Sequence, residues 1–314
     1  MASEPATIIA FYQFADLEDF ETMRDPLLAF CKQQKIFGSI LLAQEGINGT
    51  VAGSKEAIDN LLDRLRSDGR LAALEAKFST AVTPPFHRMK VRLKKEIVTL
   101  RQPDVDPVGN VGEYVDAKDW NELISDPDVV IIDTRNDYEV ELGQFKGATD
   151  PKTKSFGELP DWVDQNLDPQ KTNKVAMYCT GGIRCEKATA LMKQKGFDKV
   201  YHLKGGILKY FEEVASEESL WEGECFVFDD RVSVDHELNP GSFDLCHGCR
   251  MPITEKDKQA PEYERGVSCP RCFQETSEKH KASMRQRQIQ IDLAVKEGRV
   301  HLGPQASKPT QSVK

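Results

Sequence analysis

The pattern of hydrophobic and polar positions divides the first hundred residues into short alternating segments. Apolar runs at 8–12 and 39–42 have the length of strands, as do segments 76–82 and 87–93. Residues 17–34 and 55–66 instead carry apolar residues at the spacing of one helix face, and a hairpin through 45–51 follows the second strand. The order βαββαβ predicts a ferredoxin-like sandwich over residues 1–95.

The pattern changes after this region. Segment 101–112 (RQPDVDPVGNVG) is rich in Pro, Gly and Asp and has no apolar periodicity, so we predict an interdomain linker over residues 96–112. Beyond it, apolar runs at 129–132, 174–178 and 200–203 alternate with helical segments. This alternation predicts an α/β domain with a central parallel sheet over residues 113–218.

The last third of the chain has a different character. A short β-rich piece at 225–234 precedes a cysteine-bearing segment and a charged helix over roughly 275–296. We expect a small Cys-rich module over 219–275, then a charged helix and a disordered tail over 276–314.

The composition is typical of a globular protein without a membrane-spanning segment. The 314 residues are 39% hydrophobic, which is enough to form two or three globular domains. No apolar run could span a bilayer and the N-terminus lacks the features of a secretory signal, so we expect a cytoplasmic protein with no membrane partner. The net charge of −9 argues against bulk binding of nucleic acid, although a local basic face could override it.

Eight cysteines in a cytoplasmic chain should stay mostly reduced, so their spacing points to catalysis or metal binding. Cys179 directly follows the strand at 174–178 and precedes two glycines and a helix expected over 185–195. The glycines let successive N–H groups point inward, and the helix adds its positive end. With the Arg184 guanidinium, this field should lower the thiol pKa from about 8.5 toward neutrality.

We therefore predict a nucleophilic thiolate at Cys179 in an anion-cradling loop formed with Thr180, Gly181, Gly182, Ile183 and Cys185. The alternative is a structural cysteine beside a glycine turn. Four residues separate Cys179 from Arg184. The Cys-x5-Arg loop of cysteine phosphatases is larger, and the smaller ring here suits a compact sulfur-centred anion.

The segment CTGGIR at 179–184 resembles the active-site loop of the rhodanese superfamily. IIDTRNDYEVELGQFKGA at 131–148 looks like the upstream signature of that fold, and 203–207 resemble its closing Gly-Gly turn. A closer resemblance, to the tRNA uridine hydroxylases, rests on EGINGTVAG at 45–53, FKGATDPKTKSF at 145–156, CTGGIRCEKA at 179–188 and CHGCRMPIT at 246–254. In that branch an acylphosphatase-like (ferredoxin-like) domain precedes the rhodanese-like domain, and a Cys-rich segment follows.

The resemblance implies an enzyme that converts the wobble uridine, position 34 of tRNA, to 5-hydroxyuridine with molecular oxygen as co-substrate. The essential cysteine of the family falls on Cys179 and the loop arginine on Arg184. The charged members of the upstream signature, expected to support the loop, are Asp133, Arg135 and Glu139. Generic rhodaneses have Ser or Thr where this chain has Cys185, which either acts as a resolving thiol or, as we favour, replaces a hydroxyl.

The remaining cluster of cysteines has the spacing of a zinc site. Cys246 and Cys249 are separated by two residues, as are Cys269 and Cys272. Such paired knuckles provide the four thiolates of a closed, structural tetrahedral Zn²⁺ site. The alternative is four reduced cysteines without metal, and His247 is the expected substitute ligand.

A basic row at 87–95 could contact RNA. Arg88, Lys90, Arg92 and Lys94 alternate with apolar residues, so a strand would place the cations on one face and the apolar side chains toward the core. The C-terminal helix adds Lys279, Lys281, Arg285 and Arg287. Both surfaces could hold the anticodon arm of a tRNA, although a charged edge strand and a solvated helix face explain the same patterns.

Several mechanisms fit this loop. Cys179 could add to C6 of uracil, which makes C5 carbanion-like, or it could carry a persulfide. The sequence shows no Gly-rich dinucleotide fingerprint and no obvious two-His-one-carboxylate group, so no flavin, nicotinamide or iron cofactor is implied. The rival functions are a sulfurtransferase that passes sulfur from Cys179 to a thiol or tRNA, and a non-catalytic RNA-binding protein.

Overall fold

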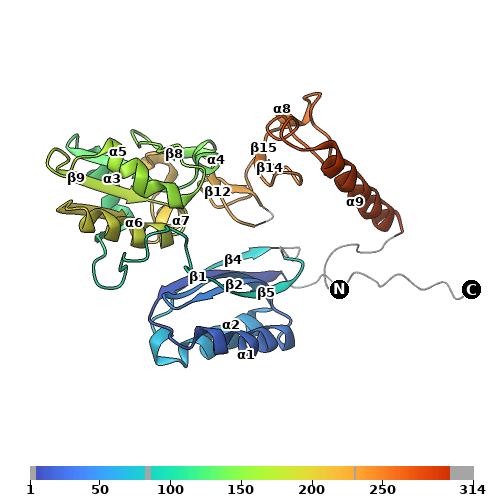
Figure 1. The fold of residues 1–314 in the computed structure, drawn as a ribbon, viewed down its shortest axis with the longest axis horizontal. Coiled ribbons are helices and arrows are strands. Elements are labelled where there is room, and N and C mark those ends of the chain that lie inside the picture. Colours follow the sequence, from blue (N-terminus) through green and yellow to red (C-terminus); the bar gives the residue numbers. More distant parts are fainter. Residues whose placement is uncertain (1–4, 82–85, 230, 298–314) are drawn as a thin grey trace, which may run out of the picture.

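The computed structural model describes residues 5–81, 86–229 and 231–297 (Figure 1). Its N-terminal domain is a five-stranded sheet in the order β4-β1-β3-β2-β5, in which β5 runs parallel to β2 and the other neighbours are antiparallel. The strands are β1 (Ala6–Phe14), β2 (Phe37–Ala43), β3 (Gly46–Gly53), β4 (Ala76–Ala81) and β5 (Met89–Leu93). The predicted ferredoxin-like order is confirmed, with β5 added at the edge beside β2.

Two helices, α1 (Phe20–Gln33) and α2 (Lys55–Arg66), cover one face of this sheet, and a short 3-10 helix, η1 (Gly69–Leu71), follows α2 (Figure 1). Helix α2 begins where the Ser54 side chain accepts a hydrogen bond from the Ala57 amide, as an N-cap does. Helix α1 starts three residues later than predicted. The backbone amide of Leu17 is bonded to Gln44 O, in the turn between β2 and β3, so it lies outside the helix.

The central domain contains a parallel four-stranded sheet in the order β6-β10-β9-β7. These strands are β6 (Glu113–Val115), β7 (Val129–Asp133), β9 (Lys174–Tyr178) and β10 (Lys199–Leu203). The helices are α3 (Ala117–Ser125), α4 (Asp137–Val140), α5 (Leu159–Asn166), α6 (Ile183–Gln194) and α7 (Gly206–Glu213), with 3-10 turns η2 (Phe156–Glu158) and η3 (Ser216–Glu218). The predicted α/β class with a parallel sheet is confirmed.

Each face of the central sheet has its own hydrophobic core. Residues of α3 and α7 join an aromatic cluster around Phe145 and Tyr178, whereas residues of α5 and α6 pack around Met177. Strand β8 (Gly143–Phe145) pairs with β11 (Trp221–Gly223) beside the aromatic cluster. Burial on both faces explains why the strands read as continuous apolar runs.

The segment predicted as a linker is well packed at its start. Ile97 and Leu100 are fully buried. The Ile97 amide donates to the Glu45 carboxylate at 2.6 Å, and the Asn48 side chain donates to Ile97 O at 3.0 Å. The segment EGINGTVAG therefore holds the connection between the two domains.

The C-terminal module consists of short strands, a short helix and a long helix. They are β12 (Cys225–Phe226), β13 (Ser233–Val234), β14 (Asp244–Leu245), β15 (Pro252–Ile253), α8 (Glu255–Lys258) and the long helix α9 (Glu278–Lys296). The tail predicted to be disordered, from Gly303, lies outside the described residues. In the parts of the chain that the structure describes, no helix has both the length and the apolar character needed to cross a bilayer.

Candidate functional site

The cysteine loop lies between β9 and α6, as the sequence predicts. Cys179 is fully buried, and its sulfur accepts a hydrogen bond from the Gly182 amide at 3.1 Å. Gly182 has φ +102°, a left-handed conformation that favours glycine, and an added Cβ would lie 2.8 Å from the Tyr12 hydroxyl. Gly182 therefore allows the curl that brings its own N–H group onto the sulfur.

The surroundings of Cys179 favour its thiolate. Burial alone would raise the thiol pKa. Hydrogen bonding from the Cys185 thiol, the positive charge of Arg184 and the amides of Cys185 and Gly182 outweigh burial, and they hold the pKa of Cys179 well below its ordinary value. This arrangement fits the predicted reactive thiolate.

Cys185 contributes to this site as a hydrogen-bond donor. It is fully buried, and its sulfur lies 3.7 Å from the Thr134 hydroxyl. Burial and the neighbouring Cys179 raise the pKa of Cys185 well above its ordinary value, so it stays a thiol while Cys179 ionises. Its position therefore fits the replacement of a hydroxyl donor, which the sequence analysis favoured.

Arg184 binds a carboxylate directly. Its two terminal nitrogens lie 2.6 and 2.8 Å from the Glu139 oxygens, and one of them donates to the Thr180 hydroxyl at 3.3 Å. Glu139 is fully buried, and its pKa is held below the ordinary value because Arg184 and Arg135 outweigh burial. Arg184 therefore acts on the thiolate through its field while its hydrogen bonds fix the loop.

The other two residues of the upstream signature support Glu139. Arg135 and Asp133 form a fully buried ion pair with an N–O distance of 2.6 Å. Arg135 also donates to the backbone carbonyls of Glu139 at 3.1 Å and Gly143 at 2.6 Å. The pair Asp133–Arg135 thus positions α4, which presents Glu139 to Arg184.

The Gly-Gly turn closes the loop from the other side. The amides of Ile207 and Leu208 donate to Cys179 O at 3.0 Å and Thr180 O at 3.2 Å. A Cβ on Gly206 would lie 2.4 Å from Cys179 O, so this close backbone approach requires glycine.

Sequence reasoning missed three side chains that contact the loop or α6, and two of them, Tyr12 and Lys77, come from the N-terminal domain. Tyr12 on β1 donates to Glu186 at 3.1 Å, and Tyr114 donates to the same carboxylate at 2.7 Å. Lys77 on β4 donates to Gly181 O at 2.8 Å and also to Gly205 O. Nothing local marks these residues, because their partners lie far away in the chain.

A buried lysine on α6 forms a second interdomain connection. Lys187, 1% exposed, lies 2.8 Å from a Glu45 oxygen and 2.5 Å from a Glu96 oxygen. Glu45 belongs to the motif EGINGTVAG and Lys187 to CTGGIRCEKA, so these two motifs, which are far apart in the sequence, are in contact.

An exposed aromatic ring lies beside the loop arginine. Phe228, in the turn between β12 and β13, is 59% exposed, and its ring centroid is 6.0 Å from the Arg184 guanidinium carbon. Phe226 supports it in an edge-to-face contact at 5.1 Å, and Tyr138 packs on Phe226 at 5.3 Å. Its position next to Arg184 could not be read from the sequence.

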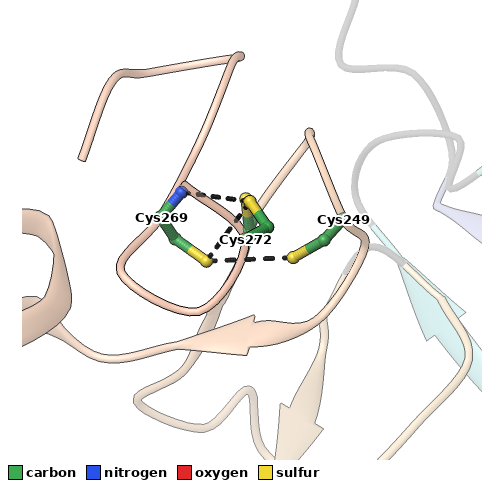
Figure 2. A group of neighbouring side chains, drawn as sticks. Cys249, Cys269 and Cys272 are labelled. Atoms are coloured by element: carbon green, nitrogen blue, oxygen red, sulfur yellow. Dashed lines mark hydrogen bonds between the residues drawn. The ribbon is translucent and has the colours of Figure 1, made fainter. Parts of the chain in front are cut away.

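The four C-terminal cysteines converge as predicted, and Figure 2 shows three of them, Cys249, Cys269 and Cys272. The four sulfur atoms all lie within 4.8 Å of one another, with separations of 4.0 Å for Cys246–Cys272 and 3.8 Å for Cys249–Cys269. A tetrahedral site with Zn–S bonds of ~2.3 Å has edges of about 3.8 Å. The cluster could hold a metal ion with four thiolates, so His247 is not needed as a ligand.

The basic row lies on and beside β5. Arg88, Arg92 and Lys94 are exposed, whereas Val91 packs in the core. Burial and the neighbouring guanidiniums of Arg92 and Arg88 lower the pKa of Lys90. Leu93, expected to face the core, is 41% exposed, so the predicted apolar row ends at Val91.

The cations of α9 mostly hold that helix to the C-terminal module. Arg285 forms paired hydrogen bonds with Glu264 at 2.7 Å. Lys281 is buried, pairs with Glu278 and lies 3.8 Å from the Phe273 ring centroid. Arg287 donates to His247 O at 3.3 Å. Of the four predicted RNA contacts on this helix, Lys279 and Arg287 are exposed.

Comparison with known proteins identifies both domains. Residues 6–97 match the UPF0176 acylphosphatase-like domain, and residues 116–213 match the rhodanese-like domain. Among solved structures, the rhodanese-like domain of an Anabaena protein is 22% identical, covering 36% of this chain and 80% of that one, with a TM-score of 0.30. A Rhodopseudomonas palustris protein described as a possible tyrosine phosphatase is 29% identical, covering 32% and 80%, with a TM-score of 0.29.

One curated relative extends over nearly the whole chain. The tRNA uridine(34) hydroxylase of Teredinibacter turnerae is 57% identical over 299 residues, which cover 95% of this chain and 93% of the relative. The aligned region is long enough to contain both domains in the same order. The chain therefore belongs to the tRNA uridine(34) hydroxylase family.

Proposed function

We propose that this protein hydroxylates uridine 34 of tRNA to 5-hydroxyuridine, with Cys179 as the reactive group and molecular oxygen as co-substrate. The observation that carries the proposal is the thiolate environment of Cys179, whose pKa is lowered by Cys185, Arg184 and two loop amides. Family membership supplies the substrate class. We place the reaction in the cytoplasm, where tRNA and reduced thiols are both present.

The chemistry begins with addition of the Cys179 thiolate to C6 of the uracil ring. The electron pair moves to C5, and the resulting enolate reacts with oxygen and a proton to give a C5 hydroperoxide. Two equivalents of a thiol reductant convert this group to a hydroxyl and water and form one disulfide. Loss of the C5 proton and departure of the thiolate from C6 then regenerate Cys179.

The base must reach a sulfur that is fully buried in this structure. A wobble base is therefore unstacked, and groups over the loop move aside when it enters. Phe228 offers an exposed ring beside Arg184, on which the uracil or a neighbouring base stacks.

The RNA backbone has a path along the N-terminal sheet. Lys90, Ser39, Thr50, Ala10 and Lys77 are successive register partners from β5 to β4, so their side chains share one face. That face lies opposite the face covered by α1 and α2 (Figure 1). Four strand spacings correspond to about 19 Å between the backbones of Lys90 and Lys77, and the Lys77 side chain contacts the cysteine loop. We propose that Arg88, Lys90, Arg92 and Lys94 bind phosphates of the anticodon arm.

We propose that the C-terminal cluster binds structural Zn²⁺ through Cys246, Cys249, Cys269 and Cys272. Their sulfur separations fit a tetrahedral ion. Four thiolates leave no open position, so the ion stabilises the module and takes no part in the chemistry.

The decisive experiment is mass spectrometry of tRNA nucleosides from cells that lack the protein. We expect 5-hydroxyuridine to disappear and to return with the wild-type chain but not with Cys179→Ser. Cys31→Ala is the matched control, since Cys31 is a buried free cysteine in the N-terminal core. Full modification by Cys179→Ser would reject the proposal.

A second candidate function is sulfur transfer, favoured by the match of residues 116–213 to the rhodanese-like domain. The same thiolate can attack a sulfane donor and carry a persulfide to a thiol or tRNA. Incubation with thiosulfate and cyanide separates the two functions. Rapid thiocyanate formation that depends on Cys179, without 5-hydroxyuridine in cells, would favour sulfur transfer.

A further inference from the structure

Lys77 brings an amine from the N-terminal domain to the backbone of the cysteine loop. Its Nζ donates to Gly181 O at 2.8 Å and also to Gly205 O, in the Gly-Gly turn. Among the residues that the structure describes, no carboxylate forms an ion pair with Lys77 at 4.0 Å or less. Two backbone carbonyls therefore replace the usual carboxylate partner of a partly buried lysine.

The geometry of a peptide unit links this contact to the sulfur. Gly181 O and the Gly182 N–H belong to one trans peptide, so they point in opposite directions. Lys77 binds the oxygen, while the N–H donates to the Cys179 sulfur at 3.1 Å. A cation on the carbonyl polarises the peptide and strengthens the hydrogen bond that its N–H donates.

We propose that Lys77 is a positioning residue of the cysteine loop, whose ammonium group orients and polarises the Gly181–Gly182 peptide so that the Gly182 amide stabilises the Cys179 thiolate. The reactive site is then formed by both domains. Docking of the N-terminal domain on the central domain completes it. This assignment rests on the proposed function and deepens it by giving the N-terminal domain a part in preparing the thiolate.

The electrostatics agree with this role. Burial lowers the pKa of Lys77 to about 8, and the Cys179 thiolate opposes that change. The amine therefore stays mostly protonated at neutral pH. The other titratable groups around the sulfur are Cys185, Arg184 and Tyr12, with Glu186 beyond the tyrosine, and those around Lys77 include Glu212 and Lys209 of α7.

The test measures the apparent pKa of Cys179 in the full-length protein without tRNA. Alkylation by iodoacetamide is followed across pH, with peptide mass spectrometry used to isolate the Cys179 signal. We compare wild type with Lys77→Met, Lys77→Gln and Lys77→Arg. Lys32→Met serves as the control, because Lys32 is an exposed lysine on α1 of the same domain.

We expect Lys77→Met to raise the apparent pKa by about one unit, which reduces alkylation up to about tenfold at pH values below it. Lys77→Gln keeps a donor but no charge and should give a smaller rise. Lys77→Arg and Lys32→Met should stay within about 0.3 units of wild type.

The inference would be overturned if the pH profiles of Cys179 alkylation were the same for wild type, Lys77→Gln and Lys77→Met. If Lys77→Met unfolds, as seen by circular dichroism, the comparison of Lys77→Gln with Lys77→Arg decides alone, and equal profiles overturn it. Because the assay contains no tRNA, it distinguishes failure of this inference from failure of the proposed hydroxylation.

Discussion

Replacing Glu139 by glutamine should destabilise the central domain while making Cys179 more acidic. Glu139 is fully buried and holds Arg184 through contacts of 2.6 and 2.8 Å. A glutamine at this position would keep the shape of the side chain but leave a buried guanidinium without its counter-charge. Loss of one partner of a buried ion pair costs about 3–5 kcal/mol of unfolding free energy.

Although the same substitution destabilises the fold, it should stabilise the thiolate form of Cys179. In wild type, Glu139 partly neutralises the charge of Arg184. Without that carboxylate the Arg184 charge acts more strongly on the sulfur, so the pKa of Cys179 should fall further. A variant that merely loosened the loop would lose the amide and thiol donors as well, and its Cys179 pKa would rise. The sign of the pKa change therefore separates the electrostatic effect from general disorder.

The assay combines urea unfolding with pH-dependent alkylation of Cys179. Glu139→Gln, Arg184→Met and the double variant form a cycle, for which we expect a coupling of about 1–3 kcal/mol. An unfolding free energy within about 1 kcal/mol of wild type for Glu139→Gln, or strictly additive single losses, would refute the reasoning.

The pH dependence provides an internal check on this pair. The pKa of Glu139 is lower in the folded protein than its ordinary value. Its contribution to stability is therefore present above the unfolded pKa of about 4.3 and is lost as pH falls through the folded value. Wild type should lose this contribution on acidification, whereas Glu139→Gln should show a flatter profile in that range.

Four further predictions concern other parts of the molecule. Cys185→Ala should raise the Cys179 pKa by up to about one unit through loss of one hydrogen bond, and Cys185→Ser should restore it, as measured by alkylation. Phe228→Ala should lower kcat/KM for tRNA about tenfold, while Phe228→Tyr stays near wild type; equal rates for all three would reject the stacking role. Lys90→Glu with Arg92→Glu should weaken tRNA binding and reduce its salt dependence, with Cys179 alkylation unchanged, in filter-binding titrations. Elemental analysis should find about one Zn²⁺ per chain, and its removal by a chelator should expose residues 246–272 to protease while the two larger domains stay folded.

Much of the fold could be predicted because its signals are local. The helix at Lys55–Arg66 and the strand at Lys174–Tyr178 have the predicted bounds, since capping and apolar runs lie within a few residues. The spacing of the cysteines was also sufficient to predict that four sulfurs would meet. The start of α1 was misplaced because the backbone of Leu17 bonds to the turn after β2, a contact between distant residues.

The sequence by itself determined the strand–loop–helix frame around Cys179 and the pair of cysteine knuckles. Only the tertiary structure decided that Arg184 binds Glu139, and that Lys77 and Phe228 reach the same loop from other parts of the chain. It also decided that most cations of α9 are held in contacts within the C-terminal module. The physical reason is that a turn or knuckle is fixed by neighbours in sequence, whereas the charge and access of a buried sulfur depend on side chains that packing brings from far along the chain.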